Sequence, residues 1–267
     1  MKEFSSSGGS VSEELKNHYK SEISFVKIKQ LLRGKDVKLN GKRINKDLNT
    51  EKGDIITVYY DGDKKDIKVL YKDENILAAY KEKGESYEEF AERVKRGYPL
   101  SEPCHRLDTN TDGVMLFSLN EIARAELFEA FKKRTIKKFY TAEVYGRPPK
   151  REDVLTAYLF KDAKKGIADI SPTPKKGYLK IVTAYKTVEE RDGSTVLEVE
   201  LLTGRTHQIR AHLAFIGNFI IGDGKYGKES VNRKFKAKTQ RLTAKKIIFS
   251  FKEGDSLYYL NGKEIGL

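Results

Sequence analysis

The stretch CHRLDTNTDGVMLF, Cys104–Phe117, sets a histidine, an arginine and an aspartate directly before a turn of small polar residues and an apolar run. The run that begins at Gly113 is apolar enough for a buried strand. Asp108 therefore lies just ahead of a buried strand and two residues after Arg106. An acid in this position, beside basic side chains, needs an explanation that the rest of the sequence has to supply.

Composition limits the classes of protein to which the chain can belong. Its 267 residues carry 52 Lys and Arg against 39 Asp and Glu, a net charge of +13, which favours a polyanion such as nucleic acid or an acidic membrane surface. No apolar run reaches the roughly 18 residues of a membrane span, and the N-terminus lacks the apolar segment of a secretory signal. One cysteine, Cys104, excludes an internal disulfide and a cysteine-based metal site. We therefore expect a soluble, cytoplasmic protein, with one large domain and a small companion.

The N-terminal part has the pattern of short elements joined by turns. The segment SSSGGS is small and polar, so residues 1–10 are expected to be a flexible lead-in. FVKIKQLLRG has apolar residues at helical spacing, with Ser24 before it as an N-cap and Gly34 where the helix ends. VKL and KRI flank the turn pair Asn40-Gly41, and IITVYY reads as a further strand. Residues 11–62 are therefore predicted to form a small α+β domain.

Basic residues dominate this small domain. Between Ser24 and Lys46 they oppose a single acid, Asp36, so phosphate is the expected partner, although a merely solvated Lys-rich face would look the same. The stretch IKQLLRGKDVKLNGKRI, followed by KGDIITV, resembles the alpha-L RNA-binding domain, also called the S-four domain. The resemblance implies contact with structured RNA. The candidate RNA-binding residues here are Lys27, Arg33, Lys35, Lys38, Lys42 and Arg43.

A charged segment at 61–66 has the composition of a linker, and residues 67–267 are predicted to form the second domain. KKFYTAEVYG alternates as a strand, so Tyr140, Ala142 and Val144 share one face. The dipeptide Asp192-Gly193 predicts a hairpin. Together with two strands around Asp73–Asn75, these patterns predict a mixed α+β fold whose sheet is mostly antiparallel.

Three helices are expected in the second domain. SYEEFAERVKRG has helical apolar spacing, and Asn120 can cap a helix that follows the buried strand. THQIRAHLAFIG reads as a helix capped by Thr206 and ended by Gly217. The core-facing residues expected in the last two helices are Ile122, Leu127, Phe128, Phe131, Ile209, Leu213 and Ile216.

The histidines and the missing nucleotide motifs narrow the chemistry. No GxGxxG motif follows a predicted strand and GxxxxGK[ST] does not occur, so nucleoside triphosphate and dinucleotide chemistry are not expected. Only His207 and His212 are close in sequence, and their five-residue spacing puts them on different helix faces. No metal site is therefore predicted. Cys104 is expected to be a small packed side chain and not a nucleophile.

Four separated motifs carry a more specific resemblance. HRLD with the strand GVMLF, then KKFYTAEVYG, then TGRTHQIRAHL and then IIGDGKYG occur in this order between Cys104 and Gly227. Together they resemble the RluA-type family of RNA pseudouridine synthases. The resemblance implies the catalytic fold of that family, an isomerase that converts uridines of RNA to pseudouridine, and a base that is flipped out of its stack.

The resemblance implies three catalytic residues. Asp108 corresponds to the catalytic aspartate, and Tyr140 to the active-site tyrosine, whose ring can stack on uracil. Arg210 of HQIR is the expected partner that keeps the aspartate ionised, in preference to Arg205. The residue types leave open whether the carboxylate attacks the sugar C1′, assists elimination to a glycal or adds to uracil. No cofactor is expected, because the isomerisation neither gains nor loses electrons or groups.

Further residues are expected to bind the RNA. By the resemblance, Arg106 can fill the gap that the flipped base leaves, although a surface ion pair or phosphate contact fits it equally. His207 and Arg205 are expected near the RNA as polar or loop-organising groups, and His105 as a structural one. The basic tract 225–241 is expected to be a mobile loop that grips the backbone, with a solvated loop as the alternative. Its candidate residues are Lys225, Arg233 and Lys234.

The sequence also departs from the family pattern. AYKEKGES lacks the Lys-Pro dipeptide that is frequent there, and TNTDG replaces the commoner TSG, which adds Asp112, expected to face outward. By analogy with members that carry an alpha-L domain, ribosomal large-subunit RNA is the expected target in preference to tRNA. The alternatives are a tRNA-directed enzyme, a non-catalytic RNA-binding or ribosome-assembly factor, and a histidine-dependent RNA-cleaving enzyme. We expect a monomer that does not bind membranes.

Overall fold

The chain folds into two compact units in the computed structural model, which describes residues 1–19, 23, 25–60, 66–162 and 166–267. Unit 1 comprises Met1–Asp66 and unit 2 comprises Ile67–Leu267. Most of the expected linker, at 61–65, and the expected N-cap Ser24 lie outside the described residues. None of the helices in the described part is both long and apolar enough to cross a bilayer.

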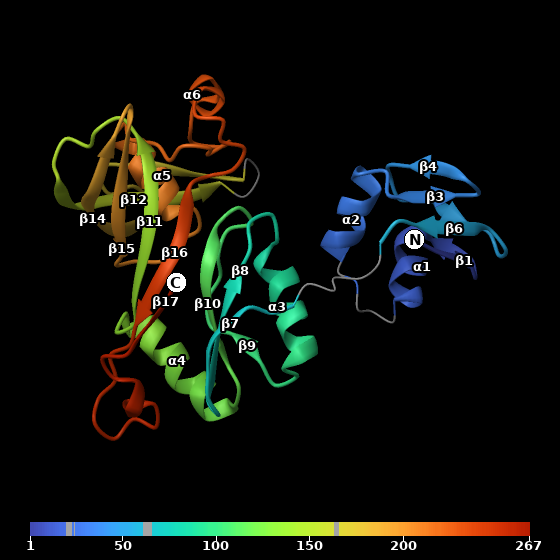
Figure 1. Ribbon diagram of the computed structural model, residues 1–267, viewed down its shortest axis with the longest axis horizontal. Coiled ribbons are helices and arrows are strands. Elements are labelled where there is room, and N and C mark those ends of the chain that lie inside the picture. Colours follow the sequence, from blue (N-terminus) through green and yellow to red (C-terminus); the bar gives the residue numbers. More distant parts are fainter. Residues whose placement is uncertain (20–22, 24, 61–65, 163–165) are drawn as a thin grey trace. The chain divides into compact units, whose positions relative to one another are not determined.

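Unit 1 is a small sheet packed on two helices (Figure 1). Its main sheet has the order β1-β6-β3-β4, and β2 pairs with β5 in a separate ribbon. Asn40 and Gly41 both have positive φ, as the predicted tight turn between β3 and β4 requires. The bounds are β1 Lys2–Ser5, β2 Gly9–Ser10, α1 Val11–His18, α2 Phe25–Arg33, β3 Val37–Leu39, β4 Lys42–Ile44, β5 Asn49–Thr50 and β6 Ile55–Val58.

The expectation of a flexible lead-in over residues 1–10 is wrong. Residues Lys2–Ser5 form β1, which pairs antiparallel with β6 along its whole length. The first helix, α1, begins directly after Ser10, whose side chain forms a reciprocal capping box with Glu13. The polar segment is therefore ordered by long-range strand pairing and by a helix cap. Strand pairing of this kind leaves no mark in the composition of the segment itself.

Unit 2 is built on one large mixed sheet with the order β13-β12-β14-β15-β11-β16-β10-β8-β7. All of its strand pairs are antiparallel except β10 with β16, so the predicted fold class is confirmed. The strand bounds are β7 Val69–Lys72, β8 Ile76–Lys81, β9 Glu102–Pro103, β10 Asp112–Ser118, β11 Lys137–Tyr145, β12 Glu152–Asp162, β13 Ile167–Ser171, β14 Leu179–Arg191, β15 Ser194–Leu201, β16 Leu242–Ile248 and β17 Glu264–Gly266.

Helices cover both faces of this sheet (Figure 1). Because side chains alternate along a strand, Leu77 and Ala79 of β8 pack in one cluster with α3 and α5, while Ile76 and Ala78 pack in another with α4. The former cluster also holds Tyr140, on the predicted inner face of β11. The helix bounds are α3 Tyr87–Gly97, α4 Glu121–Lys133, α5 Gln208–Phe215, α6 Glu229–Lys234 and the 3-10 helix η1 Tyr258–Leu260.

Two details of the predicted helices are wrong. In α4 the buried positions are Ala123, Leu127 and Ala130, while the large side chains of Ile122 and Phe128 are exposed. Small alanines thus occupy the buried face, and residue size misled the prediction. At α5 the N-cap is His207, not Thr206, and it lies in the left-handed region with a φ of +59° and no side-chain cap bond.

Candidate active site

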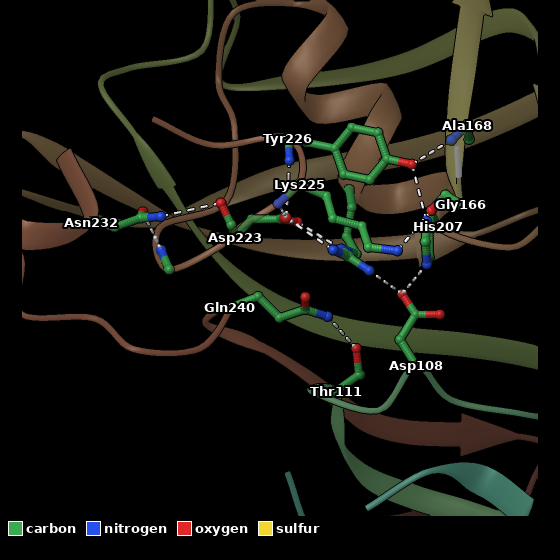
Figure 2. A network of polar contacts seen from close by, with 12 residues as sticks. Asp108, Thr111, Gly166, Ala168, His207, Asp223, Lys225, Tyr226, Asn232 and Gln240 are labelled. Carbon is green, nitrogen blue, oxygen red and sulfur yellow. Dashed lines mark hydrogen bonds and ion pairs between the residues drawn. The ribbon is translucent and has the colours of Figure 1, made fainter. Parts of the chain in front are cut away.

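The loop that carries Asp108 is fixed from three directions. Its backbone makes a tight turn in which Thr111 N–H donates to the Asp108 carbonyl at 2.9 Å. The Thr109 carbonyl accepts from Gly84 N–H at 2.9 Å and from Lys81 Nζ at 3.2 Å. Gln240 donates to the Thr111 hydroxyl at 2.8 Å (Figure 2). The Asp108 side chain therefore projects from an anchored backbone, as a preorganised site requires.

Arg210 lies between two carboxylates. It projects from the first turn of α5, and its Nη1 donates to Asp108 Oδ2 at 2.8 Å. Its Nε and Nη2 donate to the two oxygens of Asp223 at 2.6 and 2.9 Å (Figure 2). The guanidinium is nearly buried, and Asp223 is completely buried. The expected pairing of Asp108 with Arg210 is thus present, and Asp223 fixes the plane of the guanidinium.

Arg210 and Asp223 each shift the pKa of the other. Burial by itself would raise the pKa of Asp223, but the hydrogen bonds and charge of Arg210 and two backbone N–H groups outweigh it, so the pKa lies below its ordinary value. Burial likewise opposes the positive charge of Arg210, yet its two carboxylate partners raise its pKa. Both shifts favour the charged forms, so the Asp223 carboxylate and the Arg210 guanidinium form a buried ion pair to which Asp108 is hydrogen-bonded.

His207 is the second side chain next to Asp108, and Tyr226 is hydrogen-bonded to it. The Tyr226 hydroxyl accepts from Ala168 N–H at 2.6 Å, so its own proton is free to point to His207 Nδ1 at 3.0 Å. Burial lowers the pKa of His207, and a neutral ring that accepts at Nδ1 carries its proton on Nε2. This Nε2 lies 3.9 Å from Asp108 Oδ2 (Figure 2). Arg210 and His207 therefore face the same oxygen of Asp108, Oδ2.

A cavity of about 720 Å³ opens beside Asp108. Tyr140 lines it, with a side chain that is almost wholly buried and a hydroxyl that bonds to no group in the described part of the chain. Burial and the neighbouring charge of Asp108 raise the pKa of Tyr140, which therefore keeps its phenolic proton. The cavity is large enough for one nucleotide, with an aromatic ring and a carboxylate on its walls.

Cations outnumber acids around this cavity. Among the described residues that line it, the acids are Asp108 and Glu200. Arg106 and Arg205, both expected to contact RNA, are exposed at its wall, and the Arg106 guanidinium lies 4.5 Å from the ring centre of Tyr87. The lining cations are Arg106, Lys132, Arg134, Lys137, Lys138, Arg205 and Arg210.

The second basic tract is not the mobile loop that the sequence predicted. It contains α6, and Asn232 of this helix accepts from Gly222 N–H and donates to the Asp223 carbonyl (Figure 2). Lys225 donates to the Gly166 carbonyl at 2.7 Å. Of the other candidates, Arg233 pairs with Glu229 at 3.6 Å, and Lys234 is exposed. A helix and a side-chain clamp thus order the tract beside the Asp223 loop.

The candidate cations of unit 1 lie mainly at its surface. Lys38 and Arg43 both lie over the ring of Tyr59, at 5.3 and 5.1 Å from its centre. Lys27 lies 5.2 Å from the ring centre of Tyr60. The remaining candidates, all exposed, are Arg33, Lys35 and Lys42. Unit 1 therefore presents cations combined with an accessible aromatic ring.

Three neighbouring side chains have structural roles. His105 accepts from Leu116 N–H at 3.0 Å, and burial lowers its pKa to about 3. Burial raises the pKa of the Cys104 thiol to about 12, so it is not a nucleophile. Asp112 was expected to face outward but is only 15 % exposed, because it accepts from Tyr80 and Thr243 at 2.7 and 2.8 Å. No cluster of metal-ligating side chains occurs in the described ranges.

Sequence reasoning assigned no role to several residues of the site. Asp223 and Tyr226 belong to the quoted motif IIGDGKYG, where an acid between two glycines was the available signal. Lys81 is fully buried and donates to three backbone carbonyls below the Asp108 loop. Burial lowers its pKa to about 8. A lone lysine in a strand gave no sign of this.

A carboxylate that faces a cavity rich in cations is the arrangement expected of an enzyme that acts on a polyanion. The family model described as RNA pseudouridylate synthase matches residues 66–215. The match covers more than half of the 267 residues, so the chain belongs to the RNA pseudouridylate synthase family. Members of this family are isomerases that act on RNA, and the expected enzyme class is thereby confirmed.

Similar proteins place the chain with the RluA type. The dual-specificity RNA pseudouridine synthase RluA of Yersinia pestis is 32% identical over 173 residues, 59% of this chain and 81% of the relative. The ribosomal large subunit pseudouridine synthase C of Vibrio parahaemolyticus is 27% identical over 255 residues, 85% of this chain and 78% of the relative.

Solved structures agree in fold. The human RNA pseudouridylate synthase domain containing 1 has a TM-score of 0.61 at 21% identity, and covers 76% of this chain and 89% of its own. The corresponding human domain containing 4 has a TM-score of 0.57 at 21% identity, with 68% and 84% covered. At this level of identity the likeness concerns the fold alone.

The bridging geometry of Arg210 predicts unequal effects of its two partners on stability. Asp223→Asn turns an amide N–H toward a buried guanidinium, and should lower the free energy of unfolding by about 3–5 kcal/mol. Asp108→Asn, at the partly exposed end, should cost about 1–2 kcal/mol, since Arg210 keeps both bonds to Asp223. Urea denaturation of the two variants measures the difference. Equal losses would show that Asp223 is not the main anchor.

Proposed function

We propose that the enzyme isomerises uridine with Asp108 as the nucleophile. The supporting observation is the ion pair of Asp108 with Arg210 at the wall of a cavity that fits one nucleotide. A carboxylate can act as a covalent nucleophile if it stays ionised in a partly desolvated pocket. Arg210 supplies the charge that favours the ionised form, and Asp223 prevents the guanidinium from swinging away.

The geometry supports one of the two oxygens as the attacking atom. Asp108 Oδ2 accepts from Arg210 and faces His207 Nε2, whereas Oδ1 accepts from none of the described residues. We therefore assign the attack to Oδ1. The isomerisation breaks the bond from uracil N1 to C1′ and forms the bond from C5 to C1′, while a proton leaves C5 and N1 gains one. Product and substrate have equal mass, so no oxidant or other reactant is needed.

Tyr140 and Arg106 are proposed to handle the extruded base. The ring of Tyr140 lines the cavity and can stack on uracil, and its protonated hydroxyl can donate to the base or the sugar. Flipping a base out of its stack costs a few kcal/mol, which contacts to base and phosphate must offset. Arg106, exposed at the cavity wall, is suited to fill the gap.

The proposed nucleophile has a direct test. Asp108→Asn should reduce tritium release from 5-tritiated uridine in RNA to background, because a neutral amide cannot attack. RNA affinity should change less than threefold, because the cations of the cavity remain. Persistent release by a correctly folded Asp108→Asn protein would contradict the assignment. If the wild-type protein shortened the RNA, the enzyme would instead be a nuclease.

We further propose ribosomal large-subunit RNA as the target. The support is the length of the alignment with the Vibrio relative, which covers 85% of this chain. Unit 2 has only 201 of the 267 residues, so the alignment extends into unit 1. That relative is named for the ribosomal large subunit. The Yersinia relative, named dual-specificity, aligns with only 59% of the chain.

Pseudouridine maps of RNA from cells with and without the gene test this target. We expect at least one pseudouridine of large-subunit RNA to disappear on deletion and to return when the wild-type gene, but not the Asp108→Asn gene, is restored. Loss confined to tRNA would favour the tRNA-directed alternative. If no pseudouridine disappeared on deletion, the result would favour the alternative of an RNA-binding or ribosome-assembly factor.

Unit 1 is proposed to be an alpha-L domain that binds RNA backbone. Its exposed cations and the accessible ring of Tyr59 support this proposal. Replacing Lys35, Lys42 and Arg43 by Gln should reduce the slope of log affinity against log salt by about 0.7–0.9 for each phosphate that the variant no longer neutralises. The same change at three exposed lysines of unit 2 outside the cavity, Lys186, Lys245 and Lys252, should leave the slope unchanged. Equal slopes for both triple variants would count against RNA binding by unit 1.

A further inference from the structure

Lys138 is a lysine of the cavity that the chemistry described so far does not use. It lies on β11 two residues before Tyr140. Side chains two apart on a strand point to the same face, and both residues line the same cavity. The residue is half-buried, whereas the neighbouring Lys137 is exposed. Lys138 therefore brings an amine into the cavity that holds the proposed stacking ring.

The amine of Lys138 has no acidic partner in the described part of the chain. Its one polar or aromatic contact there is with the ring of Phe131, whose centre is 5.4 Å from Nζ. Asp108 is already bonded to Arg210, and Glu200, the other acid of the cavity, forms no ion pair with Lys138. Burial lowers the pKa of Lys138, and no neighbouring acid opposes this effect.

The backbone of the loop before α5 lies close to this amine. A Cβ on Gly204 would lie 3.1 Å from Lys138 Nζ, so the loop that precedes α5 passes directly against the amine. The φ of Gly204 is not positive, so its backbone conformation does not require glycine. A β-carbon at this position would crowd Nζ, and glycine avoids that contact. Arg205, the next residue, adds a second cation at the same wall.

We propose that Lys138 Nζ binds a phosphate of the RNA backbone next to the uridine in the cavity. A half-buried amine without an acid, among other cations, is matched by an anion that arrives with the substrate. Two residues along a strand span about 6.6 Å, so one nucleotide can reach from the ring of Tyr140 to the amine. This inference rests on the proposed function, because it takes the occupant of the cavity to be RNA.

Chemical protection tests this contact without turnover. The wild-type protein is acetylated with N-acetoxysuccinimide, alone, with saturating oligouridylate of eight nucleotides, or with uridine at the same nucleoside concentration. Peptide mass spectrometry then gives the rate at each lysine. Oligouridylate should slow acetylation of Lys138 at least fivefold, uridine should not, and exposed Lys186 should react equally in all three samples. Equal protection by uridine, or none by saturating oligouridylate, overturns the proposal.

Kinetics separate phosphate binding from proton transfer. Lys138→Met should raise KM for RNA about tenfold, change kcat less than twofold, and reduce the salt slope of binding by the equivalent of about one phosphate. Lys138→Arg should restore both values, because a guanidinium also binds phosphate. The matched control, Lys186→Met, removes one charge from the same sheet outside the cavity and should behave as wild type.

A loss of kcat at unchanged KM in Lys138→Met would assign the amine to proton transfer and overturn the phosphate assignment. If that variant does not fold, the protection experiment on the wild-type protein decides alone. Failure of the proposed function is recognised separately, because it appears as tritium release by Asp108→Asn, whereas the acetylation pattern does not depend on turnover.

Discussion

The site depends on one guanidinium that serves two carboxylates. A neighbouring cation favours the charged form of a buried acid, and a buried cation itself needs an anion. Arg210 meets both conditions, with two hydrogen bonds to fully buried Asp223 and one to Asp108. If Arg210 paired with Asp223 alone, the two charges would cancel. Because Arg210 also bonds to Asp108, the three side chains include one more acid than base, and Asp108 is the acid that is partly exposed.

Much of the surrounding structure serves to keep these three groups in place. The Asp108 loop is bonded to Gly84, Lys81 and Gln240, which come from distant parts of the chain. The Asp223 loop is clamped by Asn232, so the basic tract around α6 is connected to the floor of the site. RNA that contacts this tract would therefore press on the same loop that anchors Arg210. The proposed RNA-binding tract and the proposed catalytic cluster are thus connected through the hydrogen bonds of Asn232.

Local signals in the sequence predicted many of the elements, but not β1, α1 or α6. The hairpins at Asn40-Gly41 and Asp192-Gly193 form because those dipeptides fit tight turns. The partnership of Asp108 with Arg210 came from resemblance to a family, since no spacing rule connects residues 102 positions apart. Asp223 and the pairing of β1 were missed for the same reason. In α4 the periodicity was correct for Leu127 and Phe131, but Ala123 and Ala130 occupy the buried positions for which the larger Ile122 and Phe128 were chosen.

Cations near the cavity fall into two kinds, and the difference bears on how the enzyme meets its substrate. Arg210 is neutralised within the protein, which fixes its position but leaves no charge for RNA. Lys138 and Arg205 have no acid beside them among the residues that the structure describes, so each remains available to an incoming phosphate. Total charge could not make this distinction, because all three count equally toward +13. The property that separates these basic residues is whether the fold already supplies a counter-charge, and the residues without one are those that we propose to contact the RNA backbone near Asp108.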